Sequence, residues 1–161
     1  MRPLIFAVDN DPAIARLLRY TLEAEDFAVR IFGTAAEVLD QGTRPQLFLL
    51  DRGLPDKDGL ELCSEIRQSP LWADVPVIFL SGKSSESDLV AGLRLADDYI
   101  AKPFSPLELL ARIQAVLRRT KQGHLPSRLT VGELELDNES MTVQVKGQPV
   151  GVTVMEFRLL A

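Results

Sequence analysis

The sequence predicts an α/β fold, in which a doubly wound, five-stranded parallel sheet is followed by a small antiparallel sheet. Five short apolar runs alternate with stretches in which apolar residues recur at helical spacing, and parallel strands need such helical crossovers. The runs are continuous rather than alternating, which is typical of strands buried on both faces. After residue 127 the apolar period becomes two, which indicates antiparallel strands.

The composition is that of a globular protein, with 46% hydrophobic and 25% charged residues. No apolar run approaches the roughly 20 residues needed to cross a bilayer, and the N-terminus lacks a signal-type pattern. We therefore expect a cytoplasmic protein with no membrane partner. The formal charge of -5 argues against a broad DNA-binding surface on these residues, because nucleic-acid affinity is mostly phosphate neutralisation. The single cysteine, Cys63, lies at helical spacing among apolar residues and is interpreted as buried.

The first strand is predicted at residues 4–8, where a continuous apolar run stops at the polar loop Asp9-Asn10-Asp11. A helix follows, with apolar residues at helical spacing. Pro12 suits its first turn, where the missing N–H would have no partner, and Asp11 can cap the free amides.

The second strand is predicted at residues 27–32, and Thr34 is expected to cap the helix after it. Pro45 precedes the third strand, which is the buried apolar run at residues 47–50. Asp51 ends this strand.

The remaining elements of the first domain continue the alternation. Their predicted ranges are a helix at 58–68, a strand at 75–80, a helix at 86–95, a strand at 99–101 and an amphipathic helix through 107–117. Ser81 and Lys102 directly follow the fourth and fifth strands.

A polar segment containing Gly and Pro, residues 121–127, is interpreted as a linker between a domain at 1–120 and a second region at 128–161. Thr153 is predicted to cap a helix that runs to the end of the sequence, with Glu156 completing a capping box. The antiparallel strands before it are predicted through Leu129 and Val131, through Leu134 and Leu136, and from Met141 to Val145.

Charged and polar side chains follow the predicted parallel strands at their carboxyl ends, where ligands bind in open sheets of this kind. They are Asp9, Asn10, Asp11, Asp51, Ser81 and Lys102. Carboxylates packed together repel one another unless a cation neutralises them, and oxygen ligands of this type suit Mg²⁺. A carboxylate can also attack a phosphoryl group, with a metal, a lysine and a hydroxyl around the transferred oxygens. Asp51 fits the nucleophile best.

Several motifs in residues 1–120 resemble the receiver-domain signature of bacterial two-component response regulators, which implies a flavodoxin-like fold. They are Val8-Asp9-Asn10-Asp11-Pro12, Leu50-Asp51, Leu54-Pro55, Asp58-Gly59, Ser81-Gly82 and Asp97-Asp98-Tyr99-Ile100-Ala101-Lys102-Pro103-Phe104. The second region is similar to the start of the winged-helix DNA-binding domain of the OmpR/PhoB type. The similar residues are Leu129-Thr130-Val131-Gly132, Leu134-Glu135-Leu136-Asp137, Thr153 and Glu156-Phe157-Arg158-Leu159-Leu160.

The resemblance implies a phosphoacceptor signalling protein rather than an enzyme, in which Asp51 receives a phosphoryl group from a sensor histidine kinase. Asp9, Asn10, Asp51 and the backbone carbonyl of Gly53 would bind Mg²⁺. Asn10 stands where the family usually has the acid that binds the metal directly, so one negative charge is lost. Weak Mg²⁺ binding is therefore expected.

By the same resemblance, Ser81 and Lys102 contact the phosphoryl group, and Ser81 and Tyr99 form the switch that responds to it. The Lys102–Pro103 peptide bond is expected to be cis.

The resemblance also implies a homodimer through the fourth helix, fifth strand and fifth helix. Asp98 and Arg112 match one ion pair of the family's dimer face. Glu108 lacks its basic partner there, because Leu89 occupies the matching place. We expect dimerisation that is weaker or more apolar than in the family.

DNA binding is expected only of a full-length protein, with promoter DNA as the partner. A winged helix reads the major groove with a recognition helix, and this sequence ends in the first helix after the sheet, as in a truncated product. Residues 122–161 carry three basic and five acidic side chains, which cannot alone supply a phosphate-gripping surface.

Two alternatives compete with the phosphoacceptor interpretation. Phosphatases of the haloacid dehalogenase type also use an aspartate at the end of a parallel strand, but they need a second aspartate two residues on, where this sequence has Gly53. The second alternative is an atypical receiver that regulates by dimerisation or partner binding without phosphorylation. Asn10 favours it, as does the run at residues 92–97, which is one residue short and lacks the second glycine that would close the fourth helix.

Overall fold

The computed structural model describes residues 2–82, 86–121, 128–137 and 142–151. The chain forms two compact units, Met1–Leu117 and Arg118–Ala161. Each unit is described by itself below.

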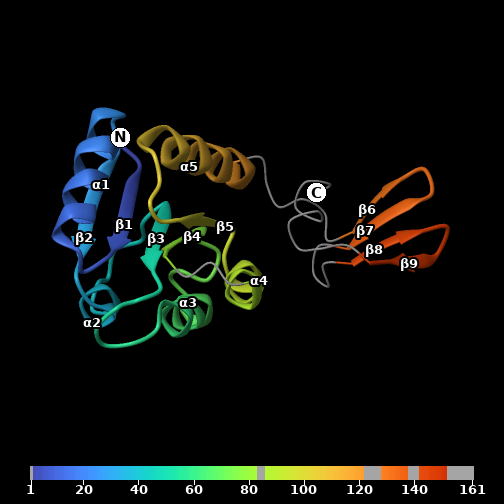
Figure 1. Ribbon diagram of the computed structural model, residues 1–161, viewed down its shortest axis with the longest axis horizontal. Helices are drawn as coiled ribbons and strands as arrows, with labels where there is room; N and C mark the ends of the chain where they lie inside the picture. Colours follow the sequence, from blue (N-terminus) through green and yellow to red (C-terminus); the bar gives the residue numbers. More distant parts are fainter. Residues whose placement is uncertain (1, 83–85, 122–127, 138–141, 152–161) are drawn as a thin grey trace. The chain divides into compact units, whose positions relative to one another are not determined.

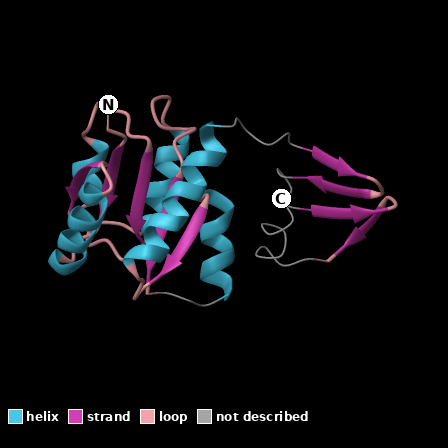
Figure 2. Cartoon of the chain, turned by 90° about the horizontal axis from the view of Figure 1, so that it is seen from above, coloured by secondary structure: helices cyan, strands magenta, loops and turns pink. Residues whose placement is uncertain are grey.

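The first unit is built on a five-stranded parallel sheet with the strand order β2-β1-β3-β4-β5. Its strands are β1 (Leu4–Val8), β2 (Ala28–Phe32), β3 (Leu47–Asp51), β4 (Val77–Ser81) and β5 (Asp98–Ala101). Its helices are α1 (Pro12–Ala24), α2 (Ala35–Leu39), α3 (Gly59–Gln68), α4 (Glu86–Leu95) and α5 (Pro106–Lys121). Helices α1 and α5 cover one face, and α2, α3 and α4 cover the other (Figure 1), and Figure 2 shows the strands of the sheet side by side from above. The predicted doubly wound, flavodoxin-like sheet is confirmed.

The first three helices begin at short polar side chains that accept hydrogen bonds from free backbone N–H groups. Asp11 caps α1 at 2.8 Å, Thr34 caps α2 at 3.2 Å and Asp58 caps α3 at 2.9 Å. Pro12 occupies the first position of α1, where no N–H is needed. The predicted caps at Asp11 and Thr34 are confirmed.

The parallel sheet is buried on both faces, which explains its continuous apolar runs. On the α1 and α5 face, strand residues pack against both helices to form one cluster. Its members include Ile5, Ala7, Leu47, Leu49, Ile78, Ile100, Leu18, Leu22, Leu109, Ile113 and Val116. Strand side chains alternate between faces, so Phe6, Phe48 and Phe79 lie on the other face, fully buried. The rings of Phe6 and Phe48 meet edge to face, 5.8 Å apart.

The bounds of β4 differ from the prediction, which started this strand at residue 75. The strand begins at Val77, because Pro76 has no N–H to give to the ladder. The carbonyl of Pro76 still accepts the N–H of Phe48 at 2.9 Å. Strand β2 likewise begins one residue later than predicted, at Ala28.

The second unit contains a four-stranded antiparallel sheet with β6 (Arg128–Val131), β7 (Leu134–Asp137), β8 (Thr142–Val145) and β9 (Gln148–Val150). The small antiparallel sheet was predicted, but β9 was not. Lys146 and Gly147, at φ of 54° and 77°, form the turn that returns the chain into it.

The predicted linker and last helix can be followed only in part. Helix α5 continues to Lys121, the first residue of the predicted linker. Residues 122–127 and the predicted helix after Thr153 lie outside the described residues. None of the described helices combines the length and apolarity that a membrane crossing requires.

Candidate functional site

The topology brings four of the predicted site residues to one edge of the parallel sheet. Asp9 directly follows β1, and Asp51 ends the neighbouring strand β3. Ser81 ends β4. Lys102 follows β5, the strand that pairs with β4. Strand order reverses between β1 and β3, which is the place where open α/β sheets bind ligands.

The ammonium of Lys102 bridges the two carboxylates at this edge. Its Nζ lies 2.7 Å from Oδ2 of Asp9 and 3.4 Å from Oδ1 of Asp51. Asp9 is 3% exposed and Asp51 9% exposed, so both carboxylates are largely removed from water. Removing one partner of a buried ion pair costs about 3–5 kcal/mol, because the other charge is left uncompensated. Lys102 is therefore the cation that lets two acids share this site.

The side chains of the acidic loop after β1 have different roles. Oδ1 of Asp9 accepts the backbone N–H of Asp11 at 2.9 Å, which orients the carboxylate. The Asp11 side chain itself caps α1. Asn10 is exposed. Of the loop side chains, Asp9 alone contacts Lys102.

The donor atoms at this edge suit Mg²⁺. Lys102 lies at Oδ1 of Asp51, whereas the other oxygen, Oδ2, is the nearest neighbour that an added Cβ on Gly53 would meet, at an ordinary 3.8 Å. Among the described residues there is no group of three or more Asp, Glu, His or Cys side chains that could hold a metal ion. The set that the resemblance predicts would combine the two carboxylates with the amide oxygen of Asn10 and the carbonyl oxygen of Gly53. All four donors are hard oxygens, the type that Mg²⁺ prefers.

The loop between β3 and α3 is anchored closely to the end of β3. The N–H of Gly59 donates to the carbonyl of Arg52 at 3.1 Å, and Gly53 forms an isolated antiparallel bridge with Asp58. A Cβ on Gly59 would lie 2.4 Å from the carbonyl oxygen of Asp51. Glycine at 59 is thus required for this approach of the helix to the strand.

Two charged side chains of the same loop were not identified from the sequence. Arg52 is 5% exposed, and its guanidinium lies 3.4 Å from Asp58. Asp56 accepts the N–H groups of Ala35 and Ala36 at 3.0 and 2.9 Å, and these two hydrogen bonds lower its pKa. The signal that could have found Arg52 is its position directly after the buried strand β3, six residues before Asp58, which caps a helix.

The hydroxyl residue and the aromatic residue of the predicted switch are both buried. Ser81 is 2% exposed, and its carbonyl accepts the N–H of Lys102 at 2.9 Å. The Tyr99 ring packs against Phe79, with centroids 6.3 Å apart, and against Gly92 of α4, where a Cβ would lie 3.1 Å from the ring. The Lys102–Pro103 peptide bond is cis, as predicted.

The predicted dimer-face charges lie together within one chain. Arg112 Nη1 is 3.3 Å from both oxygens of Asp98, and Arg112 Nε is 3.4 Å from Glu108. Glu108 therefore has a basic partner on its own helix, which was not predicted from the sequence.

Comparison with known proteins gives consistent matches. Residues 5–114 match the family described as the response regulator receiver domain. The chain is 44% identical to the phosphate regulon transcriptional regulatory protein PhoB of Rhizobium meliloti, covering 99% of this chain and 72% of that protein. It is 39% identical to the transcriptional regulatory protein CreB of Escherichia coli, covering 99% and 70%.

Solved structures agree with these matches. The response regulator DrrB, an OmpR/PhoB homolog of Thermotoga maritima, is 30% identical with a TM-score of 0.69, covering 99% of this chain and 71% of DrrB. The BeF3-activated receiver domain of DrrB is 32% identical with a TM-score of 0.69, covering 74% of this chain and 100% of that domain. The relatives are signalling proteins that regulate transcription. The chain belongs to the response regulators, in the OmpR/PhoB group of transcriptional regulators, and its first unit is their receiver domain.

Proposed function

We propose that Asp51 accepts a phosphoryl group from a sensor histidine kinase and that this modification controls transcription by a full-length protein. The observation that carries the proposal is the contact of Lys102 with both Asp9 and Asp51. It joins a nucleophile to a cation that can compensate the charge of an incoming phosphoryl group.

In the proposed step, a carboxylate oxygen of Asp51 attacks phosphorus, and the bond from phosphorus to the donor's leaving group breaks. The product is an acyl phosphate on Asp51, and the electron pair departs with the leaving group. Lys102 pairs with the transferred oxygens, and the Ser81 hydroxyl donates a hydrogen bond to one of them. Burial of Asp9 and Ser81 limits water around the new bond.

Asp9, Asn10, Asp51 and the Gly53 carbonyl would hold Mg²⁺, which receiver domains generally use for phosphorylation. The bound ion would offset the negative charge that accumulates between the carboxylates and the phosphoryl oxygens. Lys102 already contacts Oδ2 of Asp9 and the N–H of Asp11 contacts its Oδ1, so a bound metal would share the Asp9 carboxylate with both donors. Together with the neutral Asn10, this supports weak binding of Mg²⁺.

The phosphorylated receiver is proposed to form a homodimer through α4, β5 and α5. Arg112 already pairs with Asp98 and Glu108 in one chain. These ion pairs would have to be exchanged for pairs across the dimer, so their net contribution to association is small.

The proposed partners are a sensor histidine kinase and, for a full-length protein, promoter DNA. The proposed location of the interaction with the kinase is the cytoplasm. The proposed division of the chain is into a receiver at 1–120, a linker at 121–127 and the start of a winged-helix domain at 128–161. Its support is the separation of two compact units between Leu117 and Arg118.

Incubation with a small phosphodonor and Mg²⁺, followed by intact-mass analysis, tests the proposal. One phosphoryl group is expected on the wild type and on the control Asp40→Ala, which removes an exposed acid at the end of α2. Asp51→Ala should take up none. A wild type that remains unlabelled at high donor and Mg²⁺ concentrations would favour the alternative, a receiver that acts without phosphorylation. The neutral, exposed Asn10 is the observation that keeps this alternative open.

A further inference from the structure

The C-terminal end of α4 lacks the backbone feature that commonly closes a helix. Many helices end at a residue with positive φ, usually glycine, that satisfies the last carbonyls. In the described part of the chain, positive φ occurs at Asp26, Gly132, Lys146 and Gly147. Neither Ala96 nor Asp97, which follow α4, is among them. The carbonyl of Leu95, the last residue of α4, instead accepts from two side chains of α3.

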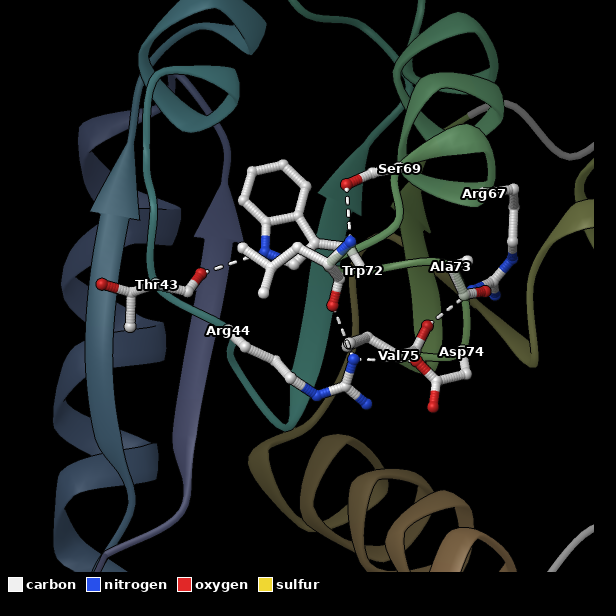
Figure 3. A network of polar contacts seen from close by, with 9 residues as sticks. Thr43, Arg44, Arg67, Ser69, Trp72, Ala73, Asp74 and Val75 are labelled. Atoms are coloured by element: carbon white, nitrogen blue, oxygen red, sulfur yellow. Dashed lines mark hydrogen bonds and ion pairs between the residues drawn. The ribbon is translucent and has the colours of Figure 1, made fainter.

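The longer of these contacts is the Cys63 thiol at 3.7 Å, and the shorter is the guanidinium of Arg67, which comes from the last turn of α3. Arg67 Nε donates to the carbonyl of Leu95, the last residue of α4, at 3.0 Å. Its Nη1 donates to Val75 at 2.6 Å and Ala73 at 3.2 Å, in the turn that leads into β4 (Figure 3). One side chain thus ties the end of α4 to two other segments.

Asp97 completes the connection between this helix end and the sheet. Its carboxylate lies 3.1 Å from Arg67 Nη2 and accepts the N–H of Val77 at 2.9 Å. The N–H of Asp97 donates to the carbonyl of Val77 at 2.8 Å. The turn between α4 and β5 is therefore bonded to the start of β4 from both its backbone and its side chain.

The charge of Arg67 suits its place. The carbonyl ends of α3 and α4 meet there, and a cation stabilises the negative end of a helix dipole. The Arg67 side chain is 25% exposed, so its hydrogen bonds are partly shielded from water. A lysine has one ammonium and cannot reach the three separate directions that a guanidinium covers.

We propose that Arg67 is the C-terminal cap of α4, acting from the neighbouring helix, and a positioning residue that makes this end of α4 its fixed end. A change at the Asp51 edge would then reach α4 through its other end, near Glu86, while residues 92–97 stay in place. This second statement rests on the proposed function of Asp51. The capping statement does not.

Hydrogen exchange of the 161-residue chain, measured without ligand, tests the cap. Arg67→Gln should speed exchange of amides in residues 92–97 by about tenfold, as expected for loss of a charge-assisted hydrogen bond at the lower end of its usual strength. Arg67→Lys should give a smaller increase, because it keeps the charge. The matched control is Arg94→Gln, which removes an exposed cation in the last turn of α4, keeps the Arg67 guanidinium in place and should leave exchange near wild type. Unchanged exchange in Arg67→Gln would overturn the cap.

A second measurement adds beryllofluoride and Mg²⁺ as a phosphoryl mimic. Wild-type exchange should change in the loop after Asp51 and in residues 86–91, but not in 92–97. In Arg67→Gln the change should extend through 92–97. Equal changes along the whole of α4 in the wild type would overturn the fixed end. No change in the loop after Asp51 would count against the proposed function and overturn the fixed end with it, while the cap would still be decided by the ligand-free measurement.

Discussion

Replacing Gly59 by alanine should have two opposing effects on the free energy of unfolding, and the two differ in size. Gly59 is the first residue of α3, and alanine has the higher helix propensity, worth at most about 1 kcal/mol. An alanine Cβ, however, would lie 2.4 Å from the carbonyl oxygen of Asp51 and 2.8 Å from the Cα of Arg52. Both obstacles are backbone atoms. They cannot rotate away as a side chain could.

Relief of the clash would require a shift of the end of β3 or the start of α3. Asp51 is paired with Leu80 in β4, so a shift of the strand would disturb the ladder, and a shift of the helix would break the Gly59 hydrogen bond to Arg52. Overpacking of this kind costs about 1–3 kcal/mol, occasionally more. With about 3 kcal/mol against and about 1 in favour, Gly59→Ala should destabilise the receiver by about 2 kcal/mol.

Urea unfolding followed by tryptophan fluorescence measures this change in the receiver unit. Trp72 is the single tryptophan of the chain and is buried beside Phe48, with its indole N–H bonded to the Thr43 carbonyl (Figure 3). The control is Gly53→Ala in the same loop, whose Cβ would meet its nearest neighbour at an ordinary 3.8 Å. The control should stay within about 0.5 kcal/mol of the wild type. If Gly59→Ala is as stable as the wild type, the close approach is not a constraint and the reasoning is refuted.

Three further predictions concern the metal site and two titrating groups. Asn10→Asp should tighten Mg²⁺ binding in a calorimetric titration, because it adds a negative charge to the proposed ligand set; equal affinities would remove Asn10 from that set. Burial raises the pKa of the Cys63 thiol from 9.0 to about 11, so the folded state holds this proton more tightly and loses stability as pH rises through that interval. The urea midpoint should therefore fall less steeply over this pH range in Cys63→Ala than in the wild type, and parallel curves would contradict the assignment. Asp56 has a pKa below 3.8 because Ala35 and Ala36 donate to it, so its stabilisation is present above that pH and is lost as pH falls through the lowered pKa. Asp56→Asn should reduce the acid sensitivity of α2 amide exchange, and an unaltered pH profile would show that the two hydrogen bonds do not govern it.

The sheet and the residues at its edge could be predicted because they depend on local patterns. A buried parallel strand must be apolar throughout, so the polar residue that ends it is visible in the sequence, as at Asp9 and Asp51. The right-handed crossover connections then bring these ends together. The contact between Lys102 and Asp9, 93 residues apart, follows from topology rather than from any local signal.

The contacts that were missed depend on side-chain directions and on packing between elements. In the sequence, Arg67 is simply a cation near the end of a predicted helix. Its hydrogen bond to the carbonyl of Leu95 depends on how α3 and α4 pack together. Arg52 is buried although it is charged, and a sequence-based prediction places arginine at the surface because this residue type is rarely buried. Strand β9 is three residues long and includes Pro149, and such short edge strands carry little periodic signal.

The central claim is that Asp51 is the residue that carries the phosphoryl group, and chemical trapping of the acyl phosphate tests it most directly. Borohydride reduces an acyl phosphate on aspartate to homoserine, so the modified residue keeps a permanent mark that peptide mass spectrometry can locate. After treatment with a phosphodonor and Mg²⁺, homoserine should appear at position 51 in the wild type, and at no position in Asp51→Ala or in protein reduced without donor. Homoserine at Asp9, at Asp11 or at any residue of Asp51→Ala would contradict the account.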